Sequence, residues 1–548
     1  MLQDTADTPF HAGELEAQSR AGVGDVAQWA GGFIRDYLPA QHRDFHTSLP
    51  FLVLSGADAN GLTWVTLVDG SGDFIGSPDA RTLTLDTFID DQDPLAAAFN
   101  AGTDVGAVGI ELASRRRNRF SGYFRKTDTG YAIDIRQTFG NCPQYIHERT
   151  WFSVARNTPA QALSGTELTA SQIALIQSAD TMFIGSGHQT GEDMPSRGYD
   201  ASHRGGAPGF VHVSDASHLH IPDYAGNNFF NTIGNLITDP HVGLVFIDFE
   251  TGSLLHISGR ATLDWQPTHT HDPDAGRMIN VEIDAVIERP GVMAIRWAKQ
   301  DHLSRRFKVA RRVKEAQDIT SFYLVPVDGK PAKPFKAGQH LPIEVQIPGQ
   351  IGTSKRSYSL SGAPDATHGY RLSIKREDKG IVSRYFHDKI GEGAILEASN
   401  PSGDFVVPCS ECPLVLVSVG VGLTPMVSML HATLSDEKAR PVWFVHGARN
   451  GAEHALRDEV AKLVSQHPSV QQRIFYSRPE AKDLKGKHYD KDGRVTARAL
   501  LALDAGAEAR YMLCGPARFL SDIRKDLEKT GIPPENIHVE AFGPASNG

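Results

Sequence analysis

The chain has 548 residues, of which 40% are hydrophobic and 22% are charged, and its formal net charge is −10 at pH 7. This composition is typical of several packed globular domains and argues against long disordered stretches and a broad basic surface for nucleic acid. The four cysteines argue against a disulfide scaffold and for a reducing compartment, so we expect a cytoplasmic protein. We expect neither a secretory signal nor a membrane span, because no sufficiently long apolar run is visible.

The first 300 residues read mainly as β-structure. Residues 1–44 predict a polar, helical lead-in, and from there short apolar runs alternate with Gly, Asp and Asn, as strands and turns do. Two dipeptides recur 137 residues further on: Val105-Gly106 as Val242-Gly243, and Ser121-Gly122 as Ser258-Gly259. We therefore predict two copies of one β domain, residues 45–160 and 165–300, packed as a pseudo-dimer within the chain.

Beyond residue 305 the pattern changes twice. Residues 305–408 read as further short strands, whereas after residue 410 nearly continuous apolar strands alternate with helices. The second pattern predicts a parallel sheet covered on both faces. One of its strands ends in Gly420-Val-Gly422, and Thr424 and Pro425 suit the N-cap and the first position of the following helix. The glycines allow a ligand to approach closely, and the helix N–H groups would hold a pyrophosphate.

A second candidate site is Arg356-Ser-Tyr358-Ser359. On a strand, Arg356 and Tyr358 share a face, so the guanidinium could pair with a phosphate while the ring covers an aromatic cofactor. Taken alone, the motif is better explained as a surface strand with an Arg–Tyr stack. Its place among other motifs changes that assessment.

Five motifs occur in one order: Arg356-Ser-Tyr-Ser359, Lys379-Gly-Ile-Val-Ser383, Gly420-Val-Gly-Leu-Thr-Pro425, Cys514-Gly-Pro516 and Glu540-Ala-Phe-Gly543. This order resembles the ferredoxin–NADP reductase superfamily over about residues 305–545, and most closely the reductase half of flavohaemoglobins. The resemblance implies an antiparallel β-barrel FAD domain at residues 305–408 and an α/β NAD(P)-binding domain at residues 410–548.

The same resemblance implies roles for single residues. The residues that would bind FAD are Arg356, Tyr358, Ser359, Gly380, Val382 and Ser383, with Tyr358 lying against the isoalloxazine ring. The residues that would receive the nicotinamide dinucleotide are Gly420, Gly422, Thr424, Pro425, Cys514, Gly515 and Pro516. Ser477 and Arg478 would grip the 2′-phosphate of NADPH. Phe542 would shield the flavin, and the expected catalytic residues are Ser359, Cys514, Glu540 and Phe542.

Residues 45–300 lack the helical pattern of a globin. The second copy resembles the pyridoxamine 5′-phosphate oxidase-like split barrel, a flavin-binding fold, through Asp200–Val211, Pro222–Tyr224 and Gly226–Leu236. This family usually has an Arg-Lys pair for the FMN phosphate, where the chain has Asn231-Thr-Ile-Gly234. The residues that could replace that pair are Ser202, His203, Arg204, Asn231, Thr232 and Asn235. We expect one working site, with the first copy as partner through Arg115–Arg119 and Gly140–Tyr145, although a solvated hairpin explains the arginine run equally well.

We interpret the chain as an NAD(P)H-dependent flavoprotein oxidoreductase. Hydride would pass from NAD(P)H to FAD, and electrons would continue to FMN, haem or a small oxidised substrate held by the split-barrel half. In one alternative, the split barrel is a cofactor-free docking or dimerisation module and the FAD reductase serves a separate protein. In another, the chain is a non-enzymatic flavin- or haem-binding redox sensor. The pair Cys409-Ser-Glu-Cys412 has no second pair, so we expect no metal site, and the sequence leaves a homodimer open.

Overall fold

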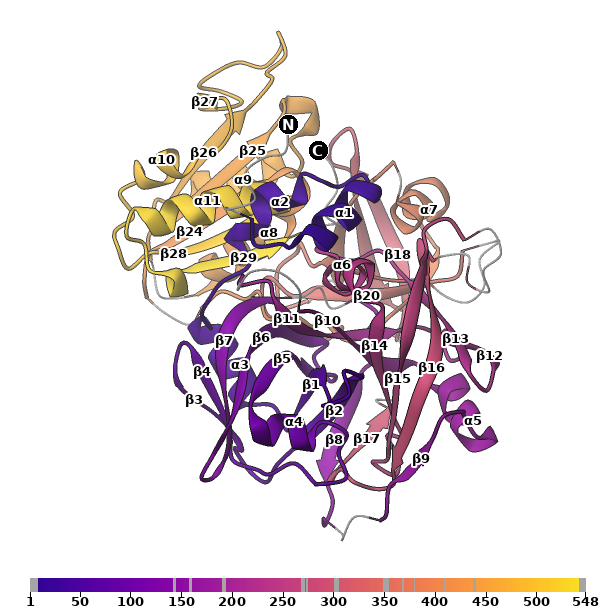
Figure 1. The fold of residues 1–548 in the computed structure, drawn as a ribbon. Coiled ribbons are helices and arrows are strands. Elements are labelled where there is room, and N and C mark those ends of the chain that lie inside the picture. The colour runs from indigo at the N-terminus through magenta and orange to yellow at the C-terminus, as the bar shows by residue number, and fades with distance from the viewer. Residues whose placement is uncertain are drawn as a thin grey trace. The chain divides into compact units, whose positions relative to one another are not determined.

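The computed structural model describes most of the chain, namely residues 8–140, 144–156, 160–189, 194–267, 272, 275–299, 305–347, 354–366, 369–378, 380–408, 411–436 and 440–541. The chain divides into two compact units at residues 300 and 301 (Figure 1). Each unit has apolar cores of its own. Each unit can therefore hold a functional site of its own.

Unit 1, residues 1–300, contains two antiparallel sheets whose strands follow the same order. The first sheet has the order β2-β1-β5-β6-β7-β4-β3, with bounds β1 Phe51–Ala57, β2 Thr63–Asp69, β3 Ile75–Asp79, β4 Thr82–Leu85, β5 Thr103–Glu111, β6 Arg116–Thr127 and β7 Gly130–Gly140. The second has the order β11-β10-β14-β15-β16-β13-β12, with bounds β10 Thr181–His188, β11 Gly198–Gly205, β12 His212–Asp215, β13 His218–Asp223, β14 His241–Ile247, β15 Leu254–Asp264 and β16 Arg277–Arg289. A β-bulge recurs at equivalent places, between Ser121 and Gly122 and between Ser258 and Gly259. The repeat in the sequence thus corresponds to a repeat of topology.

Two glycines at equivalent positions bring these sheets together. A Cβ atom on Gly106 of β5 would lie 2.4 Å from the Cα atom of Asp200 on β11. Likewise, a Cβ atom on Gly243 of β14 would lie 2.8 Å from the Cα atom of Trp64 on β2. Glycine within a strand often marks such a close approach of another backbone. One buried apolar cluster contains residues of both sheets, so the two copies share a core.

Helices and short strands complete unit 1. Equivalent helices precede β5 and β14, namely α4 (Ala96–Ala101) and α6 (Asn231–Thr238). The other elements are α1 (Ala12–Arg20), α2 (Val26–Trp29), α3 (Ala40–Thr47), α5 (Ala170–Ser178), β8 (Arg149–Ser153), β9 (Leu163–Gly165) and β17 (Ile295–Lys299). The lead-in expected at residues 1–44 is helical where the structure describes it, but it is not a separate polar segment, because His11, Glu14, Ala17 and Gln18 are buried and α3 continues to Thr47. Residues 8–47 are therefore part of the packed unit.

Unit 2, residues 301–543, begins with a six-stranded antiparallel sheet in the order β21-β20-β23-β18-β19-β22. Its strands are β18 (Arg305–Lys314), β19 (Ile319–Pro326), β20 (His340–Val345), β21 (Ser354–Ser359), β22 (Tyr370–Lys375) and β23 (Ile395–Ala398). A bridge between Leu360 and Leu372 joins the two edge strands, so the sheet closes into a barrel. The helix α7 (Ile381–Lys389) contributes Val382 and Phe386 to the barrel core.

The second half of unit 2 is a parallel sheet in the order β27-β26-β25-β24-β28-β29. Its strands are β24 (Leu414–Val419), β25 (Val442–Ala448), β26 (Val470–Tyr476), β27 (Lys491–Asp492), β28 (Arg510–Gly515) and β29 (Ile537–Ala541). The helices between them are α8 (Leu423–Ser435), α9 (Arg457–Gln466), α10 (Ala497–Leu501) and α11 (Ala517–Lys529). In open parallel sheets, ligands bind beyond the carboxyl ends of the strands, which here carry Gly420, Ser477 and Pro516.

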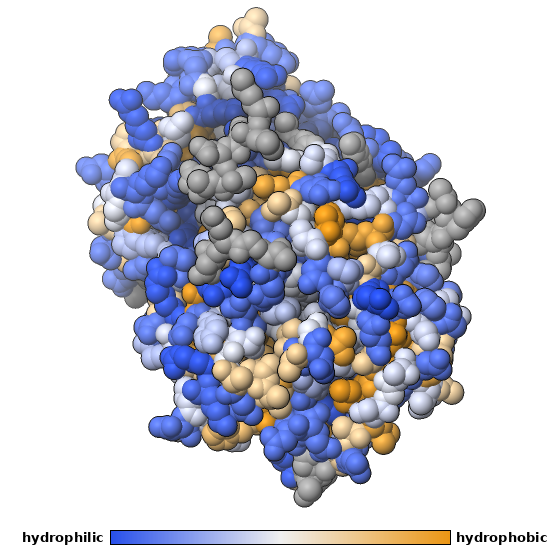
Figure 2. Space-filling view, in the orientation of Figure 1, coloured by the Kyte–Doolittle hydropathy of each residue, from blue (hydrophilic) through white to orange (hydrophobic). Residues whose placement is uncertain are grey.

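Hydrophilic side chains dominate the face of the molecule drawn in Figure 2, where hydrophobic residues form small, separate patches. Among the residues that the structure describes, no helix is long and apolar enough to span a bilayer.

Candidate functional site

The expected flavin-contacting residues lie on β21 of the barrel. The Ser359 hydroxyl oxygen is buried and has no hydrogen-bond partner among the described residues. The ring of Tyr358 packs edge-on against Phe386 at 5.5 Å, and burial raises the pKa of its phenol. Arg356 is exposed, and its guanidinium donates to the Lys355 carbonyl at 2.7 Å. The strand thus presents an unsatisfied hydroxyl beside an aromatic ring that a ligand could use.

The start of α7 follows in the same barrel. Gly380 is the N-cap of this nine-residue helix, which has no side-chain cap, so its first N–H groups are open to an anion. The Ser383 hydroxyl donates to the Gly380 carbonyl and accepts the Glu377 N–H, each at 3.2 Å. Because that proton is engaged, backbone N–H groups are the better donors here, and Val382 contributes through its backbone because its side chain is in the core. Lys379 lies outside the described residues.

The glycine loop joins β24 to α8 more tightly than expected. Gly420 has φ +58°, and residues Gly420–Gly422 form a 3-10 turn that leads into α8 at Leu423. Thr424 is therefore not the N-cap and Pro425 is not the first helical residue, because the turn starts the helical path earlier and Gly422 is the cap. The Thr424 hydroxyl instead donates to the Val421 carbonyl at 3.1 Å. A Cβ atom on Gly422 would lie 2.3 Å from the Cys514 carbonyl oxygen, so only glycine fits there.

Cys514 and Glu540 face each other on neighbouring strands. They are paired in register between β28 and β29, and Gly515 and Pro516 then lead into α11. Burial and the neighbouring Glu540 raise the pKa of Cys514 well above its usual value, so it is a neutral thiol at pH 7. Burial raises the pKa of Glu540 to about 8, and its Oε2 atom has no hydrogen-bond partner among the described residues. Phe542 lies outside those residues, as does Cys409.

Ser477 and Arg478 directly follow β26, at the same edge of the sheet. Their N–H groups donate to the carbonyls of Ala448 at 3.0 Å and Arg449 at 2.8 Å, which ties them to the end of β25. The backbone geometry therefore presents both side chains next to the carboxyl ends of two parallel strands. This is the edge at which a dinucleotide binds in open α/β sheets.

A buried polar row lies behind this edge. The Ser418 hydroxyl bonds to His446 Nδ1 at 2.9 Å, and His454 Nδ1 bonds to the Tyr476 hydroxyl at 3.0 Å. The rings of His446 and His454 are 4.9 Å apart. Burial lowers the pKa of His446 to about 4, so the ring is neutral at pH 7. The row connects the strand that precedes the glycine loop with the strand that precedes Ser477.

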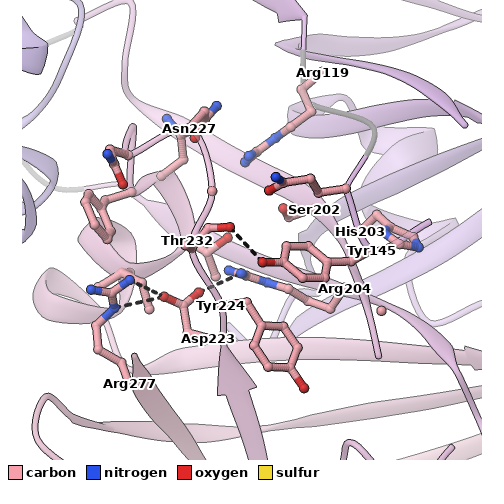
Figure 3. A pocket seen from close by; sticks show the side chains of 18 of the residues that line it. Arg119, Tyr145, Ser202, His203, Arg204, Asp223, Tyr224, Asn227, Thr232 and Arg277 are labelled. Atoms are coloured by element: carbon pink, nitrogen blue, oxygen red, sulfur yellow. Dashed lines mark hydrogen bonds and ion pairs between the residues drawn. The ribbon is translucent and has the colours of Figure 1, made fainter. Parts of the chain in front are cut away.

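Unit 1 has a pocket of its own, shown in Figure 3, with a volume of about 760 Å³ including its open mouth. The lining comes from β6, β11, β13, β16 and the start of α6, and its principal polar residues are Arg117, Arg119, Ser202, His203, Arg204, Asp223, Asn227, Asn231, Thr232 and Arg277. Both copies contribute, since β6 belongs to the first sheet and the other elements to the second.

The lining is rich in positive charge. Asp223 lies between two arginines and bonds to Arg204 at 2.6 Å and to the Arg277 Nε at 2.9 Å (Figure 3). Arg119 pairs with Asp200, and Arg117 bonds to His203 Nδ1 at 3.1 Å. Among the described residues, the lining thus contains four guanidinium groups and one carboxylate, and a second carboxylate, that of Asp200, pairs with Arg119. An anion with two negative charges, such as a phosphate monoester, suits such a site.

His203 does not add to this charge, contrary to expectation. Burial, followed by Arg117 and other nearby cations, lowers the pKa of His203 well below its usual value. The ring is therefore neutral at pH 7, and its Nε2 atom is buried without a hydrogen-bond partner among the described residues. Among the expected replacements for the missing pair, Arg204 carries the charge.

Strained backbone gathers around the same pocket. Seven non-glycine residues of the described chain have positive φ, and three of them line the pocket: Tyr145 (φ 65°), Asn228 (φ 61°) and Phe230 (φ 61°). Such conformations cost about 1–3 kcal/mol each and concentrate at functional sites. The ring of Tyr145 stacks on Tyr224 at 5.0 Å, which places an aromatic surface at the pocket.

At the equivalent place in the other half of the repeat, other residues replace the arginines of the pocket. Register pairs Arg119 with Val108 and His256 with the equivalent Val245, so His256 takes the place of Arg119. In the same way Leu254 replaces Arg117 and Val68 replaces Arg204. The carboxylate of Asp93 lies in this region, bonded to Arg289 at 2.5 Å and to the Thr66 hydroxyl. The arginine pocket therefore occurs once in the described chain.

The sequence named most, but not all, of the residues that line this pocket as candidates for one site. Ser202, His203, Arg204, Asn231 and Thr232 lie together in it, and so do Arg117 and Arg119 of the arginine run. Asn235 does not, because it lies one turn further along α6 and bonds to His11 and Ser186 instead. Arg277, Asp223 and Asn227 were missed as a set. Their proximity depends on the pairing of β13 with β16, which no local motif reveals.

The fold and these sites define unit 2 as a two-domain flavin and nicotinamide nucleotide reductase module. Residues 307–407 match the family model "oxidoreductase FAD-binding domain", and residues 416–525 match "oxidoreductase NAD-binding domain". The C-terminal region therefore belongs to the ferredoxin–NADP reductase superfamily, as a module of the flavohaemoprotein type.

Curated relatives agree over the same region. A flavohemoprotein of Deinococcus radiodurans is 42% identical over 243 residues, which are 44% of this chain and 60% of that protein. A flavohemoprotein of Bacillus cereus is 42% identical over 250 residues, 44% of this chain and 62% of the relative. The FAD/NAD-binding domain of a nitric oxide dioxygenase from Vibrio cholerae is 33% identical, covers 44% of this chain and 99% of its own, and has a TM-score of 0.40. The chain spans about 60% of the length of these curated relatives.

Proposed function

We propose that the whole chain is an NAD(P)H-dependent flavoprotein oxidoreductase with two working sites. Hydride passes from NAD(P)H to FAD in unit 2, and electrons pass on to an acceptor bound in the arginine pocket of unit 1. The acceptor site in unit 1 is supported by one observation: four arginines line its pocket, and three other lining residues have a strained backbone conformation. The cytoplasmic location expected from the cysteines is part of this proposal.

The residues of unit 2 suit their proposed roles. FAD, when bound, supplies the ring that accepts the hydride. The unsatisfied Ser359 hydroxyl donates a hydrogen bond to that ring, and Tyr358 covers it. Gly422 lets the glycine loop approach Cys514, and the thiol there stays neutral and leaves the nicotinamide space uncharged. Such a site acts mainly by holding two rings in orientation, which requires little acid–base chemistry.

The pocket of unit 1 suits FMN as the acceptor cofactor. Arg204 and the first N–H groups of α6 hold the phosphate, and the stacked Tyr145 and Tyr224 offer an aromatic surface. The repeated strand order supports a duplicated split barrel that binds one flavin between its two copies. Carrying both sites on one chain makes the second electron transfer intramolecular.

Cofactor extraction with mass identification tests this proposal. One FAD and one FMN per chain, together with NAD(P)H oxidation by an artificial electron acceptor, is the expected result. One FAD and no second cofactor favours the cofactor-free docking module. A Soret band favours haem as acceptor, which the flavohemoprotein relatives make the second candidate. Absence of NAD(P)H oxidation with every acceptor would exclude the enzyme and leave the redox sensor.

A further inference from the structure

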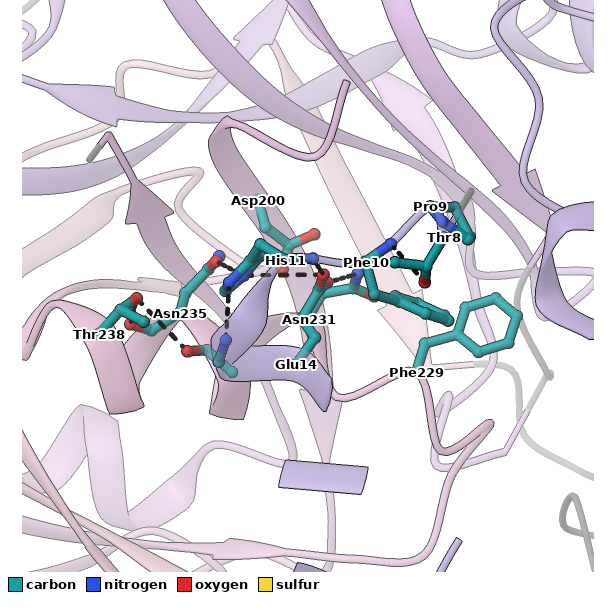
Figure 4. A network of polar contacts seen from close by, with 12 residues as sticks. Thr8, Pro9, Phe10, His11, Glu14, Asp200, Phe229, Asn231, Asn235 and Thr238 are labelled. Carbon is teal, nitrogen blue, oxygen red and sulfur yellow. Dashed lines mark hydrogen bonds and ion pairs between the residues drawn. The ribbon is translucent and has the colours of Figure 1, made fainter. Parts of the chain in front are cut away.

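The N-terminal segment of unit 1 packs directly on the helix that starts at the arginine pocket. We call residues 8–20, which include α1, the N-terminal clamp (Figure 4). A Cβ atom on Gly13 would lie 2.2 Å from the Gly234 carbonyl oxygen, and one on Gly234 would lie 2.5 Å from the Cα atom of Glu14. The two helices therefore touch backbone to backbone, which leaves little freedom for α6 to shift alone.

Polar contacts join the clamp to the pocket. Glu14 accepts the amide N–H of Asn231, a pocket residue, and also the backbone N–H of His11 at 2.9 Å (Figure 4). His11 Nε2 contacts Asn235 Oδ1 at 2.9 Å, and its ring stacks on His188 at 4.2 Å. Both oxygens of the Glu14 carboxyl thus accept a hydrogen bond, one from the His11 N–H within the clamp and one from Asn231 of the pocket.

The clamp also holds the strained loop before α6. The Gln18 amide donates to the Phe229 carbonyl at 3.3 Å. The Phe229 ring packs against Phe10 at 5.6 Å and against Phe139 of β7 at 5.5 Å. Phe229 lies between Asn228 and Phe230, two of the three left-handed residues that line the pocket. Strained conformations persist only where surrounding contacts hold them, and at this loop the clamp supplies such contacts.

We propose that the N-terminal clamp, through Glu14 and Gln18, holds the loop 224–231 in the conformation that binds the anion in unit 1. Glu14 is then a positioning residue, because it acts through Asn231 and does not touch the ligand. The identity of the ligand rests on the proposed function, whereas the hold on the loop does not.

The Glu14 carboxyl is buried within the clamp. Burial raises the pKa of Glu14 to about 8, opposed by its bonds to His11 and Asn231 and by Arg119. The other groups that face this region are Asp200, paired with Arg119, and His11, whose pKa burial lowers to about 4. A raised pKa means that the stabilisation from Glu14 is full below about pH 4.5 and is lost as pH rises through 8. Because the N–H groups of His11 and Asn231 lower this pKa, they favour the charged carboxylate, so the contact of Glu14 with Asn231 persists above pH 8.

Hydrogen exchange and FMN titration of the full chain at pH 7 test the clamp. Glu14→Ala and Gln18→Ala should both speed deuterium uptake in residues 224–231 and weaken FMN binding at least tenfold. Glu14→Gln should retain the loop and the FMN affinity, because rotation of the Asn231 amide lets its Oδ1, which has no partner among the described residues, accept from the new side chain. The control is Glu16→Gln, since Glu16 is exposed on the same helix and pairs only with Arg20 among the described residues.

The outcomes separate the clamp from the proposed function. Unchanged uptake in residues 224–231 in both alanine variants overturns the clamp, whatever FMN does. Equal FMN affinity in all variants also overturns the clamp and leaves the proposed function standing. If wild type binds no FMN but uptake responds as expected, the clamp stands and the FMN assignment is wrong. Gln18→Ala keeps the test valid if Glu14→Ala fails to fold.

Discussion

Removal of Arg204 tests the arginine pocket most directly. Arg204 bonds to Asp223 at 2.6 Å, but Arg277 also holds that carboxylate, through Nε at 2.9 Å and Nη2 at 2.8 Å. Arg204→Met therefore leaves Asp223 neutralised, and the methionine keeps most of the side-chain length. A hydrogen bond to a charged group contributes about 1.5–3 kcal/mol, which corresponds to a roughly 10- to 150-fold rise in the Kd for FMN.

The assay is titration of the flavin-free protein with FMN, followed by calorimetry or by quenching of flavin fluorescence. The control is Arg260→Met, which removes an exposed arginine of β15 that bonds to Asp284 at 3.2 Å, remote from the pocket. Thermal unfolding of both variants should match wild type, and NAD(P)H oxidation with an artificial acceptor should persist. A Kd within threefold of wild type for Arg204→Met would refute the assignment of this pocket to a phosphate.

Three further predictions concern unit 2. Arg478→Ala should raise the KM for NADPH about tenfold or more and leave the KM for NADH unchanged, because only NADPH carries the 2′-phosphate. Ser359→Ala should slow flavin reduction in stopped flow about tenfold with unchanged KM, since its hydroxyl has no partner in the described protein to lose. Glu459→Gln should lower thermal stability at pH 7 but not near pH 2. Burial of Glu459 is outweighed by its bonds to His431 and Arg371, so its pKa is lowered to about 2 and its stabilisation disappears as pH falls from about 4.5 to 2.

A different result would contradict each of these predictions. Arg473→Ala on β26 is the control for Arg478, and an equal rise in both KM values would remove the 2′-phosphate assignment. Unchanged hydride transfer in Ser359→Ala would place the flavin ring elsewhere. The melting temperatures of wild type and Glu459→Gln could instead differ by the same amount from pH 7 to pH 2. This result would show that the ion pair of Glu459 with Arg371, whose atoms are 2.6 Å apart, adds no pH-dependent stability.

Local signals in the sequence were enough to predict the reductase module. Gly420 and Gly422 stand between a continuous apolar strand and a helix, and such a context depends only on neighbouring residues. The expected class of unit 2 is confirmed by the two family models. The start of α8 was wrong by two residues, because a positive φ at Gly420 creates a 3-10 turn that propensity at Thr424 does not reveal.

In unit 1, the chain order of apolar runs and glycines by itself determined a repeated β domain, because strand periodicity and close-approach glycines are properties of short segments. Tertiary structure alone decided that arginines of both copies meet in one pocket. Arg119 and Arg204 are 85 positions apart and meet only because two sheets pack face to face. It also decided that residues 8–20 pack against α6, since Asn231 and Phe229, which bond to Glu14 and Gln18, stand more than 200 residues away. Contacts over such separations depend on the whole fold, and no pattern within a short window specifies them.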